Sequence, residues 1–183
     1  MSLPAGLLRA LRPAAIAGVL ALAILAFPPR GTRSEAQTLS DGQVKAAFLF
    51  NFAKFVKWPD ASEGPFVVGI AGNDAFAEIF TQTVRGRSVN GRELRTRRLT
   101  DGDDPSGCQM VFVAAMRPHD EGEWLQRVRG PVLTVGETTQ FLRDGGMVRF
   151  YVENNNVRFQ INQKKAESAG LKISSQLLIL AVR

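Results

Sequence analysis

The chain has 183 residues, of which 45% are hydrophobic and 22% are charged, and its formal net charge is +6. This composition is that of a chain that builds a hydrophobic core, and it excludes a disordered protein. The single cysteine excludes an intrachain disulfide, and the single histidine excludes a cluster of histidine metal ligands.

The first 36 residues predict a secretion signal. Arg9 and Arg12 precede an apolar run of about fourteen residues, which is too short to span a bilayer as a mature helix. Ser34 and Ala36 place small residues at the two positions that a signal peptidase reads, so we expect cleavage after Ala36. An uncleaved membrane anchor is the alternative interpretation. The favoured interpretation is a cleaved signal, and hence a protein that works outside the cytosol.

Residues 37–183 are expected to form a single domain. Removal of the leader takes away four arginines and one glutamate, so the formal net charge falls to +3. About 147 residues are enough for one domain with a hydrophobic core and leave little room for a second.

A helix is expected to begin near residue 41. Ser40 and Gln43 have the spacing of a capping box. Apolar residues then recur at helical spacing and define the face that we expect to be buried: Val44, Phe48, Phe52 and Phe55, flanked by Leu49 and Val56. Trp58-Pro59 should end the helix, because the residue before a proline is displaced from helical backbone.

Phe50 lies on the polar side of this predicted helix, close to Lys54 and Lys57. An aromatic ring gains nothing from water, so this one is either covered by another part of the domain or offered to a partner. The spacing leaves both interpretations open. We take Phe50 and Trp58, with Lys54 and Lys57 on their rim, as candidate partner-binding residues.

Beyond this helix, the pattern alternates between strands and helices. A short β-branched run predicts a strand over 66–70, and further strands are expected over 93–99, 110–114 and 131–135. Helical spacing predicts helices over 75–84 and 118–128. This alternation favours an α/β fold with a mostly parallel sheet covered by helices on both faces.

The last third predicts a C-terminal β-hairpin followed by two short helices. Strands are expected over 147–153 and 157–161, joined by three asparagines that tolerate the left-handed backbone of a tight turn. Asn162 is suited to cap the first helix and Gly170 to end it. The second helix, over 173–182, is apolar enough to pack back onto the domain.

Little in the sequence indicates catalysis or metal binding. His119 is interpreted as a surface residue, and the common nucleophile and nucleotide motifs are absent from the sequence. Asp101, Asp103 and Asp104 begin like a calcium loop, but Phe112 occupies the position of the bidentate glutamate, which favours a solvated turn. We expect no enzyme activity, no cofactor and no metal.

Two further positions have open interpretations. Cys108 lies in an apolar run and is expected to be a buried small side chain, with a free thiol open to oxidation as the alternative. Gly72, Asn73 and Asp74 combine a turn glycine with a helix cap, and a helix N-terminus presents backbone N–H groups to anions.

An arginine cluster is the strongest charge feature: Arg85, Arg87, Arg92, Arg95, Arg97 and Arg98. In a cytosolic protein it would suggest nucleic acid, but the secretion signal argues against that partner. The alternating spacing favours the solvated face or edge of a strand, where charge prevents unwanted pairing. An acidic protein partner or an anionic membrane surface is the alternative.

Five segments, taken in order, resemble the YfiR family of exported proteins, also known under the name HmsC. They are 48–59, Cys108 at the head of the third predicted strand, 133–136, 145–148, and 157–162 running into 169–178. The resemblance covers nearly all of the mature chain, and five spaced motifs in the same order are specific.

The resemblance implies a Rossmann-like fold, often dimeric, and a regulatory role in the periplasm. Characterised members hold an inner-membrane diguanylate cyclase inactive, which lowers cyclic di-GMP and biofilm formation. The implied partner is the periplasmic region of such a signalling protein. Several members pair the cysteine that matches Cys108 with another in the first strand. Because 66–70 contains none, redox control through that bridge is not expected here.

Two other functions stay open. A periplasmic small-ligand sensor that feeds a histidine kinase or a transporter would use the turn at 72–74 as its pocket. A hydrolase would have to rely on carboxylates alone.

Overall fold

The structure, a computed structural model, describes residues 39–59, 63–114 and 118–181, without the side chains of Pro118 and His119. The predicted signal peptide and its cleavage site lie outside the described residues. The prediction of a surface position for His119 concerns a side chain that is also outside them.

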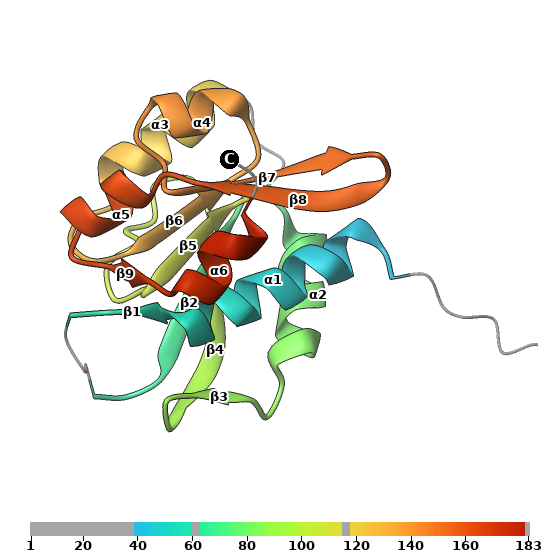
Figure 1. Cartoon of the computed structure of the whole chain (residues 1–183). Helices are drawn as coiled ribbons and strands as arrows, with labels where there is room; N and C mark the ends of the chain where they lie inside the picture. The colour runs from blue at the N-terminus through green and yellow to red at the C-terminus, as the bar shows by residue number, and fades with distance from the viewer. Residues whose placement is uncertain (1–38, 60–62, 115–117, 182–183) are drawn as a thin grey trace, which may run out of the picture. The chain divides into compact units, whose positions relative to one another are not determined.

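A mostly parallel sheet of seven strands confirms the predicted fold class (Figure 1). Its strand order is β3-β4-β2-β5-β6-β7-β8. The parallel strands are β4 (Arg92–Leu99), β2 (Phe66–Ala71), β5 (Met110–Val113), β6 (Leu133–Gly136) and β7 (Val148–Glu153). The two edge strands, β3 (Ser88–Val89) and β8 (Asn156–Ile161), are antiparallel to their neighbours.

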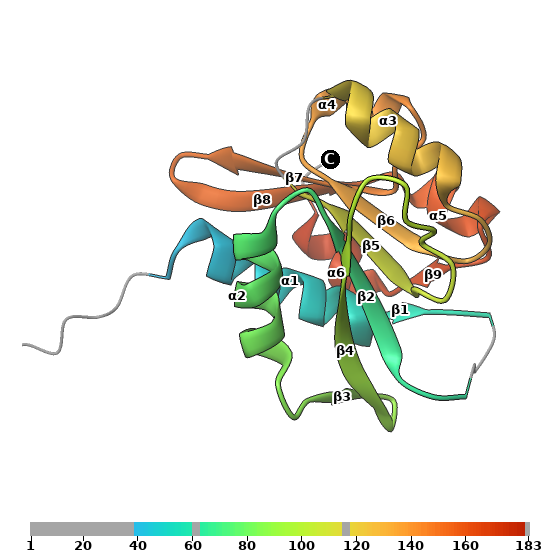
Figure 2. The same ribbon diagram turned by 180° about the vertical axis from the view of Figure 1, so that it is seen from behind.

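Helices cover both faces of this sheet, as the alternation predicts (Figures 1 and 2). They are α1 (Asp41–Phe55), α2 (Asp74–Val84), α3 (Pro118–Arg127), α4 (Thr139–Arg143), α5 (Gln163–Ser168) and α6 (Ser175–Leu180). Buried residues of α1, α2 and α6 form one core with Val68 and Ile70 of β2. Trp124 of α3 and Phe141 of α4 form a second core on the opposite face.

The first helix begins as predicted and ends earlier than predicted. Ser40 and Gln43 form a capping box in which each side chain accepts the backbone N–H of the other residue. The helix ends at Phe55, because Val56 is extended and pairs with Ile173 in a small antiparallel sheet. Strands β1 (Val56–Lys57) and β9 (Lys172–Ile173) make up that sheet. The prediction that the helix continues to Trp58-Pro59 is therefore wrong.

The buried face of α1 is rotated slightly from the predicted stripe. The residues that it buries are Ala46, Leu49, Phe52 and Ala53, while Val44, Phe48 and Phe55 are half-buried. Small alanine side chains allow the helix to lie close to the sheet, and the large phenylalanines fill the space at its flanks. Phe48 packs on Phe159 of β8, with ring centroids 5.2 Å apart.

The C-terminal hairpin is confirmed, and its second helix starts later than expected. Asn154 and Asn155 adopt the left-handed backbone of the turn, with φ of 49° and 60°. Ile173 belongs to strand β9, because it pairs with β1. Ser174 caps α6 by accepting the N–H of Leu177, so that helix begins at Ser175.

Cys108 is buried, with 3% of its surface exposed, which confirms its interpretation as a small core side chain. It packs in the second core, and burial raises the pKa of its thiol. The thiol is therefore not poised as a nucleophile.

Candidate functional site

Trp58 directly follows β1, and its indole ring is held in place by a hydrogen bond and by an aromatic contact. Its Nε1–H donates a hydrogen bond to the carbonyl oxygen of Gln109 at 3.0 Å. Its ring meets the edge of Phe66, with centroids 4.9 Å apart. The side-chain Oε1 of Gln109 in turn accepts the N–H of Val67 at 2.8 Å. Trp58 is therefore locked onto the start of β2 while part of its ring stays exposed.

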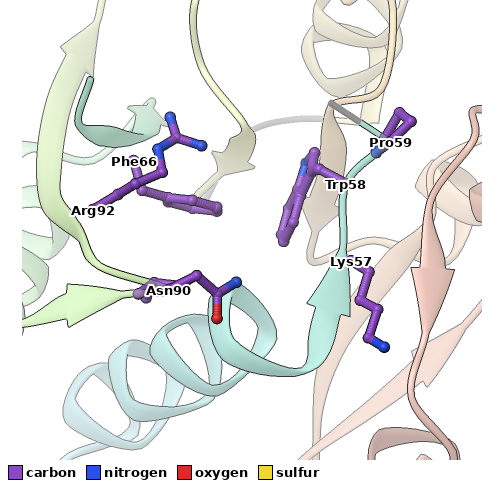
Figure 3. Close-up of a pocket in the computed structure, with 7 residues that line it drawn as sticks. Lys57, Trp58, Pro59, Phe66, Asn90 and Arg92 are labelled. Carbon is purple, nitrogen blue, oxygen red and sulfur yellow. The ribbon is translucent and has the colours of Figure 1, made fainter. Parts of the chain in front are cut away.

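A hollow of about 370 Å³ opens beside this tryptophan, and we call it the Trp58 hollow. It is lined by Lys57, Trp58, Pro59, Phe66, Val89, Asn90 and Arg92. The Trp58 and Phe66 rings, which are in edge-to-face contact, lie together on its lining, and Asn90 and Arg92 lie on the side away from Trp58 (Figure 3). Its walls are aromatic, and its charged lining residues are two cations.

Arg92 lies on the side of the hollow away from Trp58 and is held there by hydrogen bonds. Its guanidinium donates to the carbonyl oxygens of Gly64 at 2.8 Å and Pro65 at 2.7 Å. The same group lies 5.6 Å from the centroid of the Phe66 ring, within the range of a cation–π contact. The positive charge is thus held at the edge of an aromatic surface.

A tight turn brings Asn90 to the rim of the hollow. Asn90 and Gly91 have φ of 51° and 79°, the left-handed pair that a two-residue hairpin between β3 and β4 requires. Val89 is buried just before the turn. An Asn-Gly pair is a strong hairpin signal that the sequence-based prediction missed.

Phe50 does not line the Trp58 hollow. It is half-buried against the first core, and the guanidinium carbon of Arg87 lies 4.8 Å from its ring centroid. Lys54 lies 5.5 Å from the same centroid. The ring is therefore partly covered by its own domain, and the exposed part is flanked by cations.

Lys54 and Lys57 are both exposed, as their predicted rim position requires. The side chain of Lys57 extends away from Trp58, on the other side of β1 (Figure 3). Trp58 and Lys57 thus both border the hollow but with their side chains directed apart, while the half-buried Phe50 and the exposed Lys54 lie on α1 outside it.

Four of the six arginines in the cluster fall into two groups. Arg95 and Arg98 on β4 are exposed and pair with Glu93 at 2.6 Å and Glu78 at 3.1 Å. This is the solvated strand that the spacing favours. Arg87 and Arg92 instead lie over the aromatic rings of Phe50 and Phe66.

A second hollow, of about 220 Å³, lies at the carboxyl end of β2, and we call it the switch-point hollow. It is lined by Gly42, Lys45, Asn73, Ala75, Phe76, Ile79, Phe112, Ala114 and Glu137. The strand order places β4 and β5 on opposite sides of β2, so the direction of the chain's winding reverses here. Open α/β sheets bind ligands at such a point.

An ion pair closes one side of the switch-point hollow. Lys45 of α1 donates to Glu137 at 2.5 Å, and each side chain is about a fifth exposed, at 19% and 21%. Asn73, predicted as the cap of α2, accepts the N–H of Phe76 at 2.9 Å. The turn at 72–74 therefore lies at a hollow, but its asparagine oxygen already has a partner in the helix.

Glu121 of α3 is a fully buried carboxylate that holds the turn after β6. Its Oε1 accepts the backbone N–H groups of Glu137 at 2.9 Å and Thr138 at 3.3 Å. The Thr138 hydroxyl donates to its other oxygen. Burial raises the pKa of Glu121 despite these hydrogen bonds. The residue positions Glu137, and sequence pattern alone did not reveal it.

The described residues offer neither a metal-ligand cluster nor a membrane-spanning helix. Nowhere in 39–59, 63–114 or 118–181 do three His, Cys, Asp or Glu side chains gather as metal ligands would. Over the same ranges, no helix is both long and apolar enough to cross a bilayer.

The architecture defines a Rossmann-like α/β domain with an aromatic hollow at one end of its sheet and, at the other end, a mostly apolar hollow that is bordered by an ion pair. A family model described as YfiR/HmsC-like matches residues 42–182, so the chain belongs to that family. The family is periplasmic and regulatory rather than catalytic. No curated protein matches the chain.

Proposed function

We propose that this protein is a periplasmic repressor that holds an inner-membrane diguanylate cyclase inactive by binding its periplasmic region. The result is less cyclic di-GMP and less biofilm. The observation that carries the proposal is the family match over residues 42–182. An exported repressor needs no catalytic centre, since binding to one state of its target is sufficient to shift that target's equilibrium.

The energetic demand on such a repressor is moderate. Turning a switch from mostly on to mostly off takes about 5 kcal/mol of preferential binding to the inactive state. Aromatic side chains at the centre of an interface supply energies of this size, while charges on the rim add rate and specificity. The Trp58 hollow and its cations have both components.

We propose that the docking surface includes Phe50, Trp58, Lys54 and Lys57. Trp58 supports this because its ring is held rigidly with part of its face exposed, which lowers the entropy lost on binding. Phe50 contributes the exposed part of its ring beside Lys54.

The function is tested first by deletion of the gene. Cellular cyclic di-GMP should rise, and the wild-type gene supplied in trans should restore the low level. An unchanged level in the deletion strain contradicts the proposal. A neighbouring gene that encodes a membrane protein with a GGDEF domain would identify the target to purify.

The docking surface is tested by charge reversal at its exposed lysines. Lys54→Glu with Lys57→Glu should raise cyclic di-GMP toward the level of the deletion strain, because the rim then repels the partner. Lys164→Glu with Lys165→Glu, at two exposed positions of α5, makes the same change in charge and is the matched control, which should leave repression intact. Equal effects of the two variants contradict the assignment of the surface. Each variant's thermal midpoint shows whether it is folded.

The half-buried state of Phe50 determines how its own test is read. A charged residue there should release repression, but a variant that melts would show that Phe50 serves the core. Phe50→Leu keeps most of the apolar volume and should therefore stay folded while losing part of the aromatic contact.

A ligand sensor is the second candidate, favoured by the switch-point hollow. Its position at the carboxyl ends of β2 and β5, and its mixture of apolar side chains with the Lys45–Glu137 pair, are typical of small-molecule sites. A panel of periplasmic metabolites should then raise the thermal midpoint, and Lys45→Met should abolish the shift. No shift with any compound argues against a sensor.

A further inference from the structure

We propose that the Trp58 hollow receives an apolar anchor side chain from a partner segment that carries acidic residues next to that anchor. This inference rests on the proposed function, because it specifies the chemistry by which the target is held. The proposed occupant is a protein segment, rather than a metabolite or a second copy of this chain.

The shape and the walls of the hollow select the anchor. About 370 Å³ beside the Trp58 ring is enough space for one leucine, phenylalanine or tryptophan side chain. The half-buried Trp58 offers ring surface, and the buried side chains of Phe66 and Val89 form an apolar floor. Apolar pockets of this kind, with a rigid aromatic wall, are where single side chains contribute most to protein–protein binding.

The charge around the hollow favours acidic residues next to the anchor in the partner segment. Arg92 and Lys57 line the hollow, with the Lys57 side chain extending away from Trp58, and the described lining contains no carboxylate. Arg92 makes its contacts with neutral carbonyl oxygens, so its positive charge is not cancelled there by an acid. A partner whose anchor is preceded or followed by aspartate or glutamate is therefore electrostatically complementary.

The hollow is rigid before any partner arrives. A hydrogen bond to Gln109 holds the Trp58 ring, and hydrogen bonds to two carbonyl oxygens hold the Arg92 guanidinium. The left-handed turn fixes the backbone of Asn90. A preformed pocket spends little binding energy on ordering its own side chains.

Synthetic peptides test the pocket without knowledge of the natural partner. The probe is an eight-residue peptide of Asp, Ser and Gly with one central Leu, and the controls replace Leu by Ala or Asp by Lys. The protein, purified in the form in which cells accumulate it and labelled with ¹⁵N, is titrated with each peptide. The Trp58 indole and Asn90 side-chain amide signals are followed by NMR.

The acidic Leu peptide should shift the Trp58 and Asn90 signals. The Ala peptide should bind about 30-fold more weakly, because it lacks the anchor. The Lys peptide should leave both signals unchanged, and added salt should weaken the Leu peptide. Unchanged Trp58 and Asn90 signals at millimolar acidic peptide, or equal binding of the three peptides, would overturn the proposal.

Asn90→Asp is the sharpest variant, because it adds one negative charge to the rim at nearly constant shape. Aspartate tolerates the left-handed backbone that Asn90 adopts, so the turn should survive. Binding of the acidic peptide should fall about three-fold. Asn154→Asp makes the same change at a left-handed position in the β7–β8 turn and should have no effect. Equal losses from the two variants would contradict a local site.

The two proposals fail separately. Peptide binding at the Trp58 hollow with no rise of cyclic di-GMP in the deletion strain would retain the pocket and reject the cyclase as its target. A rise of cyclic di-GMP in that strain, combined with full repression by Asn90→Asp and Trp58→Leu, would retain the repressor and reject the hollow as its docking point.

Discussion

The two hollows lie at opposite ends of β2 and are built on different principles. At the amino end, a hollow opens beside the contacting rings of Phe66 and Trp58, and the charged residues in its described lining are the cations Lys57 and Arg92. At the carboxyl end, Lys45 and Glu137 neutralise each other above an apolar floor. The amino end is therefore suited to a charged macromolecular partner, and the carboxyl end to a small ligand or to purely structural use. The predictions below test this contrast.

Phe66→Ala should have the largest effect on the amino end. The ring is 2% exposed and packs against both Trp58 and Arg92. Its removal should lower the free energy of unfolding by about 3–5 kcal/mol, from lost transfer energy and the cavity left behind. Urea unfolding followed by circular dichroism measures this loss. Phe66→Leu is the control and should cost less than about 1.5 kcal/mol. A loss below 1 kcal/mol for Phe66→Ala would show that neighbouring side chains move in to fill the gap.

Gly69→Cys tests the strand that joins the two hollows. A Cβ atom at residue 69 would lie 3.1 Å from the Cys108 sulfur, close to the distance of about 3 Å that a disulfide requires. The same atom would approach Leu99 to 2.6 Å, but that contact is with the end of a flexible side chain. We expect a bridge to form, and the oxidised variant to be about 2–4 kcal/mol more stable than the reduced one.

The control for this bridge is Gly69→Ser, which introduces the same crowding at Leu99 without a second sulfur. Its stability should not respond to reductant. If reductant also leaves the free energy of unfolding of Gly69→Cys in urea unchanged, the side chains at residues 69 and 108 do not form the bridge that the geometry predicts.

Glu121 tests how the carboxyl end is positioned. Replacement by Leu leaves the N–H groups of Glu137 and Thr138 without their acceptor, and should cost about 1–3 kcal/mol. Glu121→Gln keeps an oxygen for both groups and is the control. Near-identical stabilities of the two variants would show that water or a rearranged backbone replaces the carboxylate.

The same residue should make stability depend on pH. Burial raises the pKa of Glu121 above its ordinary value of 4.5, so the folded state binds this proton more readily than the unfolded state. The contribution of this group to stability is therefore fully present below the ordinary pKa and falls as pH rises through the raised one. Glu121→Gln should remove this contribution. If the difference in the free energy of unfolding between the wild type and Glu121→Gln does not change with pH, the raised pKa is contradicted.

The sheet was predictable from sequence because its central strands are fully buried. Every residue of β5 and β6 is buried, so each strand reads as a short apolar run, and these runs alternate with helical patterns. The cap of α1 was equally clear, since a capping box is a purely local signal. Strands β1 and β9 were not predictable, because residues 56–57 and 172–173 become strands only by pairing with each other.

The candidate site was predictable only in part, for a related reason. Trp58 could be selected because an aromatic residue just beyond an amphipathic helix is conspicuous in the sequence. Phe66 was assigned only to a strand, and Arg92 only to a charge cluster. Their meeting with Trp58 depends on β4 lying beside β2, which periodicity does not specify.

The Lys45–Glu137 pair should give the smallest effect of the series. Both side chains are partly exposed, so solvent screens the attraction and the loss of side-chain entropy offsets much of it. Lys45→Met should therefore change the free energy of unfolding by no more than about 1 kcal/mol, and the difference should shrink at high salt. A double-mutant cycle with Glu137→Gln isolates the coupling between the two residues. A coupling above 2 kcal/mol would show that the carboxyl end depends on this pair for stability, and the pair would then be a structural clamp rather than part of a ligand site.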